Sequence, residues 1–312
     1  MLSVIMPAHN SEKYIGKSID SILNQSFKQF ELLIYNDCST DKTLNIIREY
    51  QKKDSRIKIF SGKKNIKQPL ALNFLLKKTK YPYVALNDSD DISNPDRFLK
   101  QIVFLEKNQE YGAVGSYALI INENSKFIRK IKYPTDNIEI KKKLPHINCF
   151  AQSSMMIRKK IVFKVGLFNK LLDPAQDYDM WCRFSHITKL SNIPEYLIKY
   201  REHSLSSSNL KRKLSFYKSE FIKINYKYLK KKKDLINSKN ISQINKSTVL
   251  QLLHNNKKKI NKIKLESSFS DMAYFLKEHK IVKFLFCFID IFFKDPVFMI
   301  KKINFFINKT YK

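Results

Sequence analysis

Three carboxylates crowd into four positions directly after a short apolar run at 83–86: Asp88, Asp90 and Asp91. Charges of one sign this close repel each other, so folding them together is costly unless a cation lies among them. A hard divalent ion such as Mg²⁺ takes oxygen ligands of this kind. Asp88 and Asp90 are two residues apart and leave the same face of an extended chain, so they could share one ion that also holds a phosphate. The alternative is a solvated acidic turn capping a helix that begins near Pro95.

The elements that must position these carboxylates alternate along the chain. Apolar runs at 2–6, 30–35, 57–60 and 83–86 predict buried strands, and apolar residues at helical spacing predict helices at 12–25, 43–50 and 70–78. Ser11 is the expected N-cap of the first helix. Strict alternation of strand and helix predicts an α/β fold with a parallel sheet and right-handed crossovers.

Polar groups follow two of these strands at the point where each strand ends. Asn36 and Asp37 end the second strand, and Asp88 follows the fourth. Ligands of parallel sheets bind outside the carboxyl ends of the strands. This placement favours a binding site over a plain acidic turn.

The following stretch to residue 166 continues the pattern. We expect a strand at 112–122, a partner strand at 127–133, a further strand at 147–157 and a basic helix from Arg158 to near Gly166. The chain lacks the glycine-rich motifs G-x-G-x-x-G and G-x-x-x-x-G-K-[ST], which argues against a dinucleotide cofactor and a P-loop. A base-recognising carboxylate near an acidic pair instead fits a nucleoside diphosphate.

Positive charge is distributed unevenly along the 312-residue chain. The formal net charge is +31, and residues 206–312 carry 25 Lys or Arg against 7 Asp or Glu. Such a balance indicates an anionic partner, namely nucleic acid, anionic lipid or a phosphorylated substrate. The 4 cysteines are scattered without metal-binding spacing and predict reduced thiols in a cytosolic protein. The N-terminus lacks the basic region of a signal peptide, and the apolar run 281–293 is shorter than the ~20 residues of a spanning helix.

Several stretches, in this order and spacing, resemble the family 2 glycosyltransferases over about residues 1–205. They are S-V-I-M-P-A-H-N from Ser3, S-I-L-N-Q-S from Ser21, F-E-L-L-I-Y-N-D-C-S-T-D from Phe30 and N-D-S-D-D from Asn87. The resemblance implies the GT-A fold, a Rossmann-like, mostly parallel sheet flanked by helices. It also implies a nucleotide-sugar donor and inversion at the anomeric carbon. Residues 206–312 would then be a basic, aromatic-rich helical extension.

The resemblance assigns the nucleotide to the ends of the first two strands. The residues that match its donor-binding segments are Pro7, Ala8, His9, Asn10, Asp37, Asn65, Asp88 and Ser89. Asp37 would contact the base, while Asn36 replaces the family's first Asp and offers a donor as well as an acceptor. Cys38 and Lys67 stand where the family has glycine, so a positive φ at Cys38 would be strained.

The family's D-x-D element corresponds to Asp88-Ser89-Asp90 and would hold Mn²⁺ or Mg²⁺ across the diphosphate. A bound cation stabilises the negative charge that develops as the nucleoside diphosphate departs. His203, in the segment Y-R-E-H-S, matches a histidine that approaches the metal in such enzymes, so the expected metal ligands are Asp88, Asp90 and His203. A surface histidine is the alternative.

Asp177 matches the family's catalytic base in the segment Q-D-Y-D-M-W-C-R. A hydroxyl is a poor nucleophile, and a carboxylate within hydrogen-bond reach takes its proton as attack develops. We expect Asp177 near a helix start, where the helix dipole keeps it ionised; a plain helix cap is the alternative. Gln176 replaces the usual Glu, and Trp181 lines an acceptor pocket or belongs to the core.

The extension after residue 206 combines lysine clusters at 230–233 and 257–259 with an aromatic block at 284–293. Basic and aromatic residues together predict interfacial helices on an anionic membrane. A helical cap that packs on the catalytic domain is the alternative. We therefore expect a cytoplasmic protein, peripheral on the inner face of the cytoplasmic membrane.

Together these observations predict a metal-dependent inverting glycosyltransferase of the hexosyltransferase type. It would move a sugar from a nucleoside-diphosphate donor, expected to be a UDP-sugar, to a hydroxyl of a glycan or lipid-linked acceptor in surface-polysaccharide synthesis. The alternative is a non-catalytic nucleic-acid or membrane-binding protein on a GT-A scaffold. Retention of the acidic element and of Asp177 favours the enzyme, with no nucleic-acid partner. A sugar nucleotidylyltransferase would need a Gly-rich, Arg-bearing loop where Ala8-His9-Asn10 stands.

Overall fold

The computed structural model describes residues 1–203, 211–229, 244, 246–252, 288, 291, 294–296 and 298–300. By their contacts, the chain divides into two compact units. The first comprises Met1–Leu210 and Phe221–Ser242, and the second comprises Lys211–Glu220 and Gln243–Lys312. The expected division at residue 205 stays a prediction.

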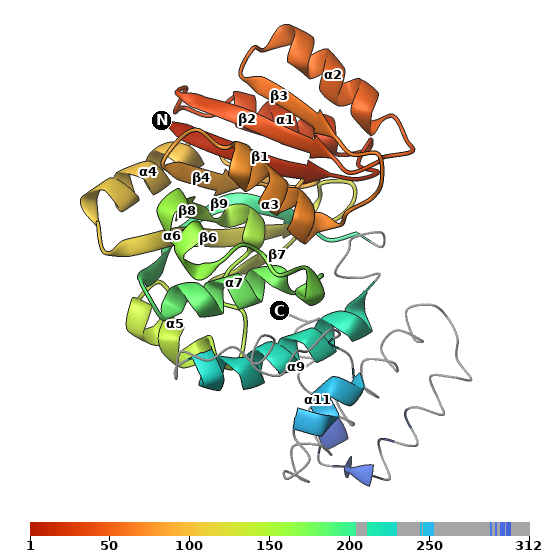
Figure 1. The fold of residues 1–312 in the computed structure, drawn as a ribbon, viewed down its shortest axis with the longest axis vertical. Helices are drawn as coiled ribbons and strands as arrows, with labels where there is room; N and C mark the ends of the chain where they lie inside the picture. Colours follow the sequence, from red (N-terminus) through yellow and green to blue (C-terminus); the bar gives the residue numbers. More distant parts are fainter. Residues whose placement is uncertain are drawn as a thin grey trace. The chain divides into compact units, whose positions relative to one another are not determined.

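The first unit is built on a sheet that has nine strands within residues 1–203, in the order β3-β2-β1-β4-β8-β6-β9-β5, with β7 paired to β6 (Figure 1). The strands are β1 (Leu2–Ala8), β2 (Phe30–Asn36), β3 (Ile57–Ser61), β4 (Tyr83–Leu86), β5 (Ile92–Ser93), β6 (Tyr111–Ile121), β7 (Phe127–Ile131), β8 (Met156–Arg158) and β9 (Lys189–Arg201). Strands β3, β2, β1 and β4 are parallel, as the alternation of elements predicts. Strand β8 joins them antiparallel to β4, and β6 pairs with β9 in parallel.

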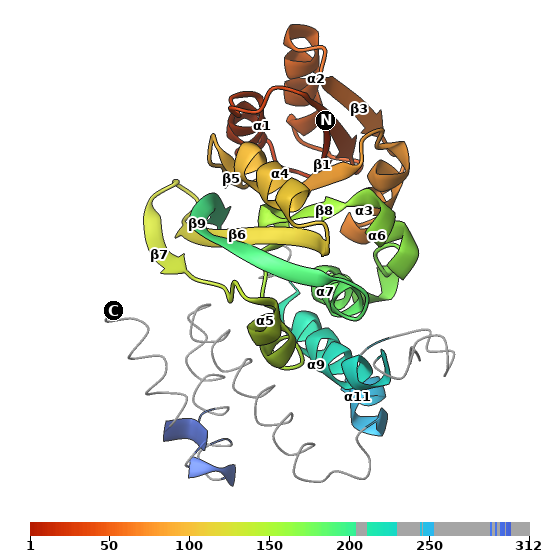
Figure 2. The same ribbon diagram turned by 90° about the vertical axis from the view of Figure 1, so that its left-hand side faces the viewer.

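Helices cover both faces of this sheet (Figure 2). Within residues 1–203 they are α1 (Ile15–Leu23), α2 (Thr43–Lys53), α3 (Gln68–Lys78), α4 (Arg97–Lys107), α5 (Asn137–Lys143), α6 (Lys159–Val165) and α7 (Gln176–Ser185), with 3₁₀ turns at Gln152–Ser154 and Lys170–Leu172. Helices α1 and α4 lie on one face, and α3 and α6 lie on the other. This two-sided cover explains why the central strands are apolar on both faces.

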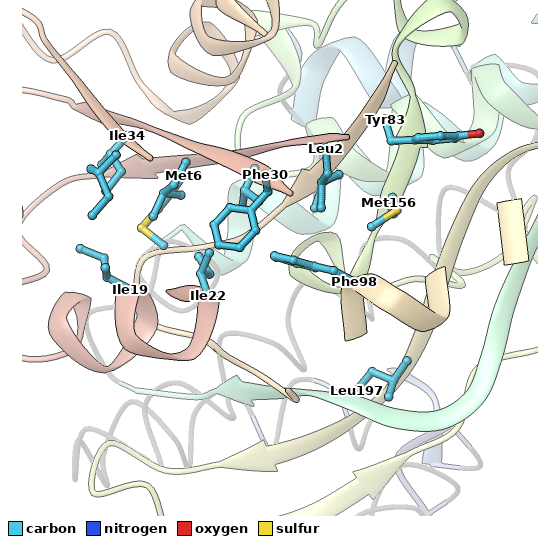
Figure 3. Close-up of a cluster of buried hydrophobic side chains, with 14 of the residues drawn as sticks. Leu2, Met6, Ile19, Ile22, Phe30, Ile34, Tyr83, Phe98, Met156 and Leu197 are labelled. Carbon is cyan, nitrogen blue, oxygen red and sulfur yellow. The ribbon is translucent and has the colours of Figure 1, made fainter. Parts of the chain in front are cut away.

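The core between the sheet and α1 follows from the alternation of side chains along β1. Leu2 and Met6 point to the same face, where they meet Ile19 and Ile22 of α1 and Phe98 of α4 (Figure 3). All of these side chains are fully buried. This packing fixes the strand ends and therefore the loops that follow them.

Two local expectations were wrong. Helix α1 has Tyr14 as its N-cap, without a side-chain hydrogen bond, because Ser11 lies one turn earlier. The Ser11 carbonyl accepts from the Tyr14 and Ile15 amides, and its hydroxyl is engaged with Ser89. The strand expected at 147–157 is confined to Met156–Arg158, since the polar residues before it turn into a 3₁₀ helix and bond to the acidic loop.

Two helices are described beyond residue 210. Helix α9 (Arg212–Leu229) continues from residues of the second unit into residues of the first, and α11 (Lys246–Leu252) belongs to the second. Their lysines fit the expected basic helical extension. The lysine clusters at 230–233 and 257–259 lie outside the described residues, as does the aromatic block at 284–293 apart from Phe288 and Ile291. Among the described residues, every helix is too short or too polar to span a bilayer.

Candidate active site at the carboxyl ends of the strands

The loops that follow β1 and β2 are bonded to each other. The Asp37 amide donates to the Ala8 carbonyl (2.8 Å), and His9 Nδ1 donates to the Asp37 carbonyl (2.8 Å). Asn10 Oδ1 accepts from the Thr40 amide at 2.9 Å. Pro7 and Ala8 are buried, whereas His9 and Asn10 are exposed. The structure thus brings the expected nucleotide-binding residues of these two loops to one edge of the sheet.

Asp37 has a structural task that the sequence did not indicate. Its two carboxylate oxygens accept from the backbone amides of Ile66 (2.7 Å) and Lys67 (2.9 Å), and its side chain is buried. Asn65 Oδ1 also accepts from the Lys67 amide at 3.1 Å. Asp37 therefore holds the loop before α3, and its contact with a base stays a prediction. The neighbouring Asn36 Oδ1 is buried and lacks a hydrogen-bond partner among the described residues.

Two positions at which the resemblance assigns glycine keep a left-handed backbone. Cys38 has φ 58° and Lys67 has φ 71°. The strain expected at Cys38 is therefore present, because residues with a Cβ are disfavoured at positive φ. The loop shape persists without the glycine, and surrounding contacts such as those of Asp37 hold it.

Asp88, two residues after the end of β4, is half-buried and contacts two glutamines. Its Oδ1 accepts from Gln68 Nε2 at the start of α3 and from Gln152 Nε2 of the 3₁₀ turn, each at 2.9 Å. Burial, followed by the charge of Asp90, raises the pKa of Asp88 to about 7. The site thus carries an excess of negative charge that favours a proton or a cation at Asp88.

The other proposed metal ligands lie beside it. Asp90 Oδ2 and His203 Nε2 are 3.0 Å apart, and the His203 ring packs against Tyr14. Among the described residues, no three His, Cys, Asp or Glu side chains form a preassembled metal cluster. A Mg²⁺ or Mn²⁺ ion held by one or two carboxylates and by substrate phosphates does not require one. Asp88 and Asp90, with His203 bonded to Asp90, offer donors of the kind that such an ion takes. Ser89 Oγ is 2.7 Å from Ser11 Oγ and ties the acidic loop to the β1 loop.

Two arginines hold the acidic loop through hydrogen bonds to its backbone carbonyls. Arg97 of α4 is fully buried and donates to the Leu86 carbonyl (2.8 Å), to Asn87 Oδ1 (3.1 Å) and to Ser93 Oγ (2.9 Å). Arg201 of β9 donates through Nε to the Asp90 carbonyl at 2.8 Å, and its amide donates to Asp91 Oδ1 at 2.7 Å. Asp91 is therefore a structural anchor of the loop.

Asp177 is the second residue of α7, as the sequence predicts. Its Oδ2 accepts from Asn148 Nδ2 at 2.8 Å. Burial raises the pKa of Asp177 above its ordinary value despite the hydrogen bonds that it accepts, and the expectation that the helix dipole keeps it ionised stays a prediction. A raised pKa makes the carboxylate a stronger base than an ordinary Asp. Asp179 is paired with Arg183 at 2.8 Å and is committed to the helix.

Trp181 belongs to the core rather than to an acceptor pocket. Its side chain is fully buried and makes edge contacts with Phe150 and Phe184. Gln68, Asn148 and Arg97 were missed as site residues; Gln68 and Asn148 bond to carboxylates 20 and 29 residues away in sequence.

Comparisons with known proteins agree with this architecture. The family described as Glycosyl transferase family 2 matches residues 3–166. The O-antigen biosynthesis glycosyltransferase WbnJ of Escherichia coli is 37% identical over 227 residues, which cover 70% of this chain and 85% of WbnJ. The putative glycosyltransferase EpsE of Bacillus subtilis is 32% identical, with 65% and 73% covered.

Two solved structures share the fold. The TarS 1–349 structure of S. aureus in complex with UDP-GlcNAc aligns with a TM-score of 0.57 at 17% identity, covering 91% of this chain and 89% of TarS. The mannosyltransferase PcManGT of Pyrobaculum calidifontis, in complex with GDP-Man and Mn²⁺, aligns with a TM-score of 0.56 at 13% identity, covering 88% and 75%. With the arrangement of its strands and its acidic loop, the chain belongs to glycosyl transferase family 2 and is a glycosyltransferase with the GT-A fold.

Proposed function

We propose that this glycosyltransferase moves a sugar from a nucleoside-diphosphate donor to a hydroxyl of a glycan or lipid-linked acceptor, with inversion and with the help of Mn²⁺ or Mg²⁺. One observation carries the proposal. Gln176 bonds to both glutamines that hold Asp88, and Asp177 is the next residue. Asp88 is thus held by a hydrogen-bonded frame that includes the residue directly before the expected base.

The proposed role of each residue follows from its position relative to this frame. Asp88, Asp90 and His203 would hold the metal ion, which supplies charge stabilisation to the departing diphosphate when it is bound. Asp177 would take the proton of the acceptor hydroxyl as its oxygen bonds to the anomeric carbon and the bond to the diphosphate breaks. A single displacement of this kind inverts the anomeric centre. Asn148 holds the Asp177 carboxylate in place.

The relatives support the substrate class. WbnJ is named for O-antigen biosynthesis, and the structures of similar fold contain UDP-GlcNAc or GDP-Man, one of them with Mn²⁺. We expect a UDP-sugar as donor and a surface-polysaccharide intermediate as acceptor. The lysines and aromatics after residue 206 support a place on the anionic inner face of the cytoplasmic membrane.

The test is calorimetric binding of UDP and of GDP with and without Mn²⁺. We expect one nucleotide to bind only when Mn²⁺ is present, and Asp90→Ala to abolish that binding while the protein stays folded. Asp96→Ala is the matched control, since Asp96 is an exposed residue before α4. Undiminished Mn²⁺-dependent binding in Asp90→Ala would show that the metal lies elsewhere. Failure of both nucleotides to bind the unaltered protein would contradict the proposed function.

A further inference from the structure

Three glutamines from separate elements form a closed ring with Asp88. Gln68 of α3 and Gln152 of the 3₁₀ turn both donate to Asp88 Oδ1. Gln176 of α7 donates through Nε2 to Gln68 Oε1 at 2.9 Å and to Gln152 Oε1 at 3.3 Å. The ring joins segments that are 108 residues apart in sequence.

The direction of every amide in this ring is determined by Asp88. The Asp88 oxygen accepts, so Gln68 and Gln152 present their NH₂ groups to it. Their carbonyl oxygens then face Gln176, and two acceptors require a donor between them. Gln176 must therefore point its NH₂ group into the ring and its carbonyl oxygen away from it.

That outward oxygen is left without a partner. Gln176 is only 2% exposed, and its Oε1 is buried with no hydrogen-bond donor among the described residues. A buried acceptor without a donor is unfavourable, and most such atoms in folded proteins find a partner. A glutamate at this position would place an acceptor against the two carbonyl oxygens, so the ring needs the amide that stands here instead of the family's usual Glu.

We propose that Gln176 Oε1 accepts a hydrogen bond from a hydroxyl or amide N–H of the donor's sugar ring, which makes Gln176 a determinant of sugar specificity. This inference rests on the proposed function. In a direct displacement the sugar lies between the leaving diphosphate and the attacking hydroxyl. Gln176 bonds to the two glutamines that hold Asp88 and directly precedes Asp177, so a sugar held between these two carboxylates would come within reach of its side chain.

The chemistry of the atom narrows the ligand. A carbonyl oxygen accepts hydrogen bonds and repels phosphate or carboxylate oxygens, so it does not read the diphosphate. It selects for a hydrogen-bond donor on the sugar. A sugar that lacks this donor leaves the oxygen buried and unpaired, and its binding is correspondingly weaker.

The experiment compares how much the sugar adds to binding. Affinities of UDP, GDP, UDP-Glc, UDP-Gal, UDP-GlcNAc and GDP-Man are measured by calorimetry with Mn²⁺, and the ratio of each nucleotide sugar to its own nucleoside diphosphate is taken. In Gln176→Met we expect the ratio for the preferred sugar to fall roughly three- to tenfold, the effect of one hydrogen bond. Gln109→Met is the matched control, because it makes the same change at an exposed glutamine outside the site, and its ratio should stay near that of the unaltered protein.

The ratio separates the outcomes. An unchanged ratio in Gln176→Met overturns the inference, even where both affinities fall together. An equal fall in Gln109→Met also overturns it, because the effect then does not belong to position 176. If the unaltered protein binds a nucleoside diphosphate but gains nothing from any of the sugars, the inference is wrong while the nucleotide-binding function stands. Should Gln176→Met not fold, Gln176→Asn withdraws the amide by one methylene and carries the same expectation.

Discussion

Replacement of Asp177 by Asn separates a catalytic base from a helix cap. The change preserves shape and removes the ability to accept a proton. The local hydrogen bond survives, because Asn148 Oδ1 accepts from the Phe150 amide at 3.2 Å and so keeps Asn148 Nδ2 directed at position 177. The carbonyl oxygen of the new amide takes the place of Asp177 Oδ2 as acceptor. We therefore expect the geometry of the site to be retained.

The expected loss is kinetic. A positioned general base contributes about 10²–10⁴-fold, so kcat should fall by that factor, or about 2.7–5.4 kcal/mol in the barrier. Nucleoside diphosphate binding should be unchanged, since Asp177 faces the acceptor. In the unaltered enzyme, activity should rise with pH through a pKa above the ordinary Asp value, because burial raises the pKa of Asp177 and only the ionised form accepts a proton. This acidic limb should be absent in Asp177→Asn.

The stability of the folded protein should depend on pH in the direction opposite to that of its activity. A carboxyl whose folded pKa is raised loses stability as pH rises through that pKa, and the loss is absent below the unfolded value of about 4. Asp177→Asn should therefore be more stable relative to the parent at pH 7 than at pH 3.5, as measured by urea unfolding. Turnover of the nucleotide sugar by the variant within about threefold of the parent, far less than the expected loss, would refute the role of Asp177 as the base.

Three further changes test the supporting structure and the extension. Arg97→Met should lower the free energy of unfolding by about 3–5 kcal/mol, because it removes a buried charge and leaves its partners unpaired. Lys107→Met, at the exposed end of the same helix, should change this free energy little. Equal effects of the two variants in a urea titration would contradict this account. Cys38→Gly should raise the free energy of unfolding by about 0.5–1 kcal/mol, since relief of the positive φ exceeds the added chain entropy, and a decrease in the same assay would show that Cys38 is not strained. Deletion of residues 281–312 should reduce sedimentation with vesicles that contain acidic lipid, and equal binding by the truncated protein would favour the packing cap.

The sequence was sufficient for the first half of the sheet. Each of β1, β2, β3 and β4 falls where an apolar run predicts it, and β1, β2 and β4 are buried throughout, which favours largely apolar sequences. The parallel arrangement of these strands also predicted that Asp88 and Asp37 lie at one edge of the sheet, since parallel strands end on the same side. Asp177 at the start of α7 was also visible from local pattern.

Contacts between residues that are distant in sequence could not be predicted from local sequence patterns. The segment before β8 was expected to be a strand from its resemblance to an acceptor-side strand of the family, but Gln152 and Ser153 bond to Asp88 and Asp91. The capture of Asp37 by the Ile66 and Lys67 amides depends on the fold of a loop some 30 residues away in sequence. The spacing of residues along the chain does not predict such hydrogen bonds.

The acidic loop shows how the fold tolerates carboxylates at one place. Arg97 and the Arg201 amide support the loop, and the two glutamines donate to Asp88. These donors offset part of the repulsion that the sequence predicts. They do not offset all of it, because the pKa of Asp88 stays raised to about 7, first by burial and then by Asp90. The remaining demand for positive charge falls on the side chains of Asp88 and Asp90, because Arg97 donates to the Leu86 carbonyl and Arg201 to the Asp90 carbonyl. A divalent ion at that point would satisfy this demand, and its own unfilled coordination positions would then be open to a diphosphate.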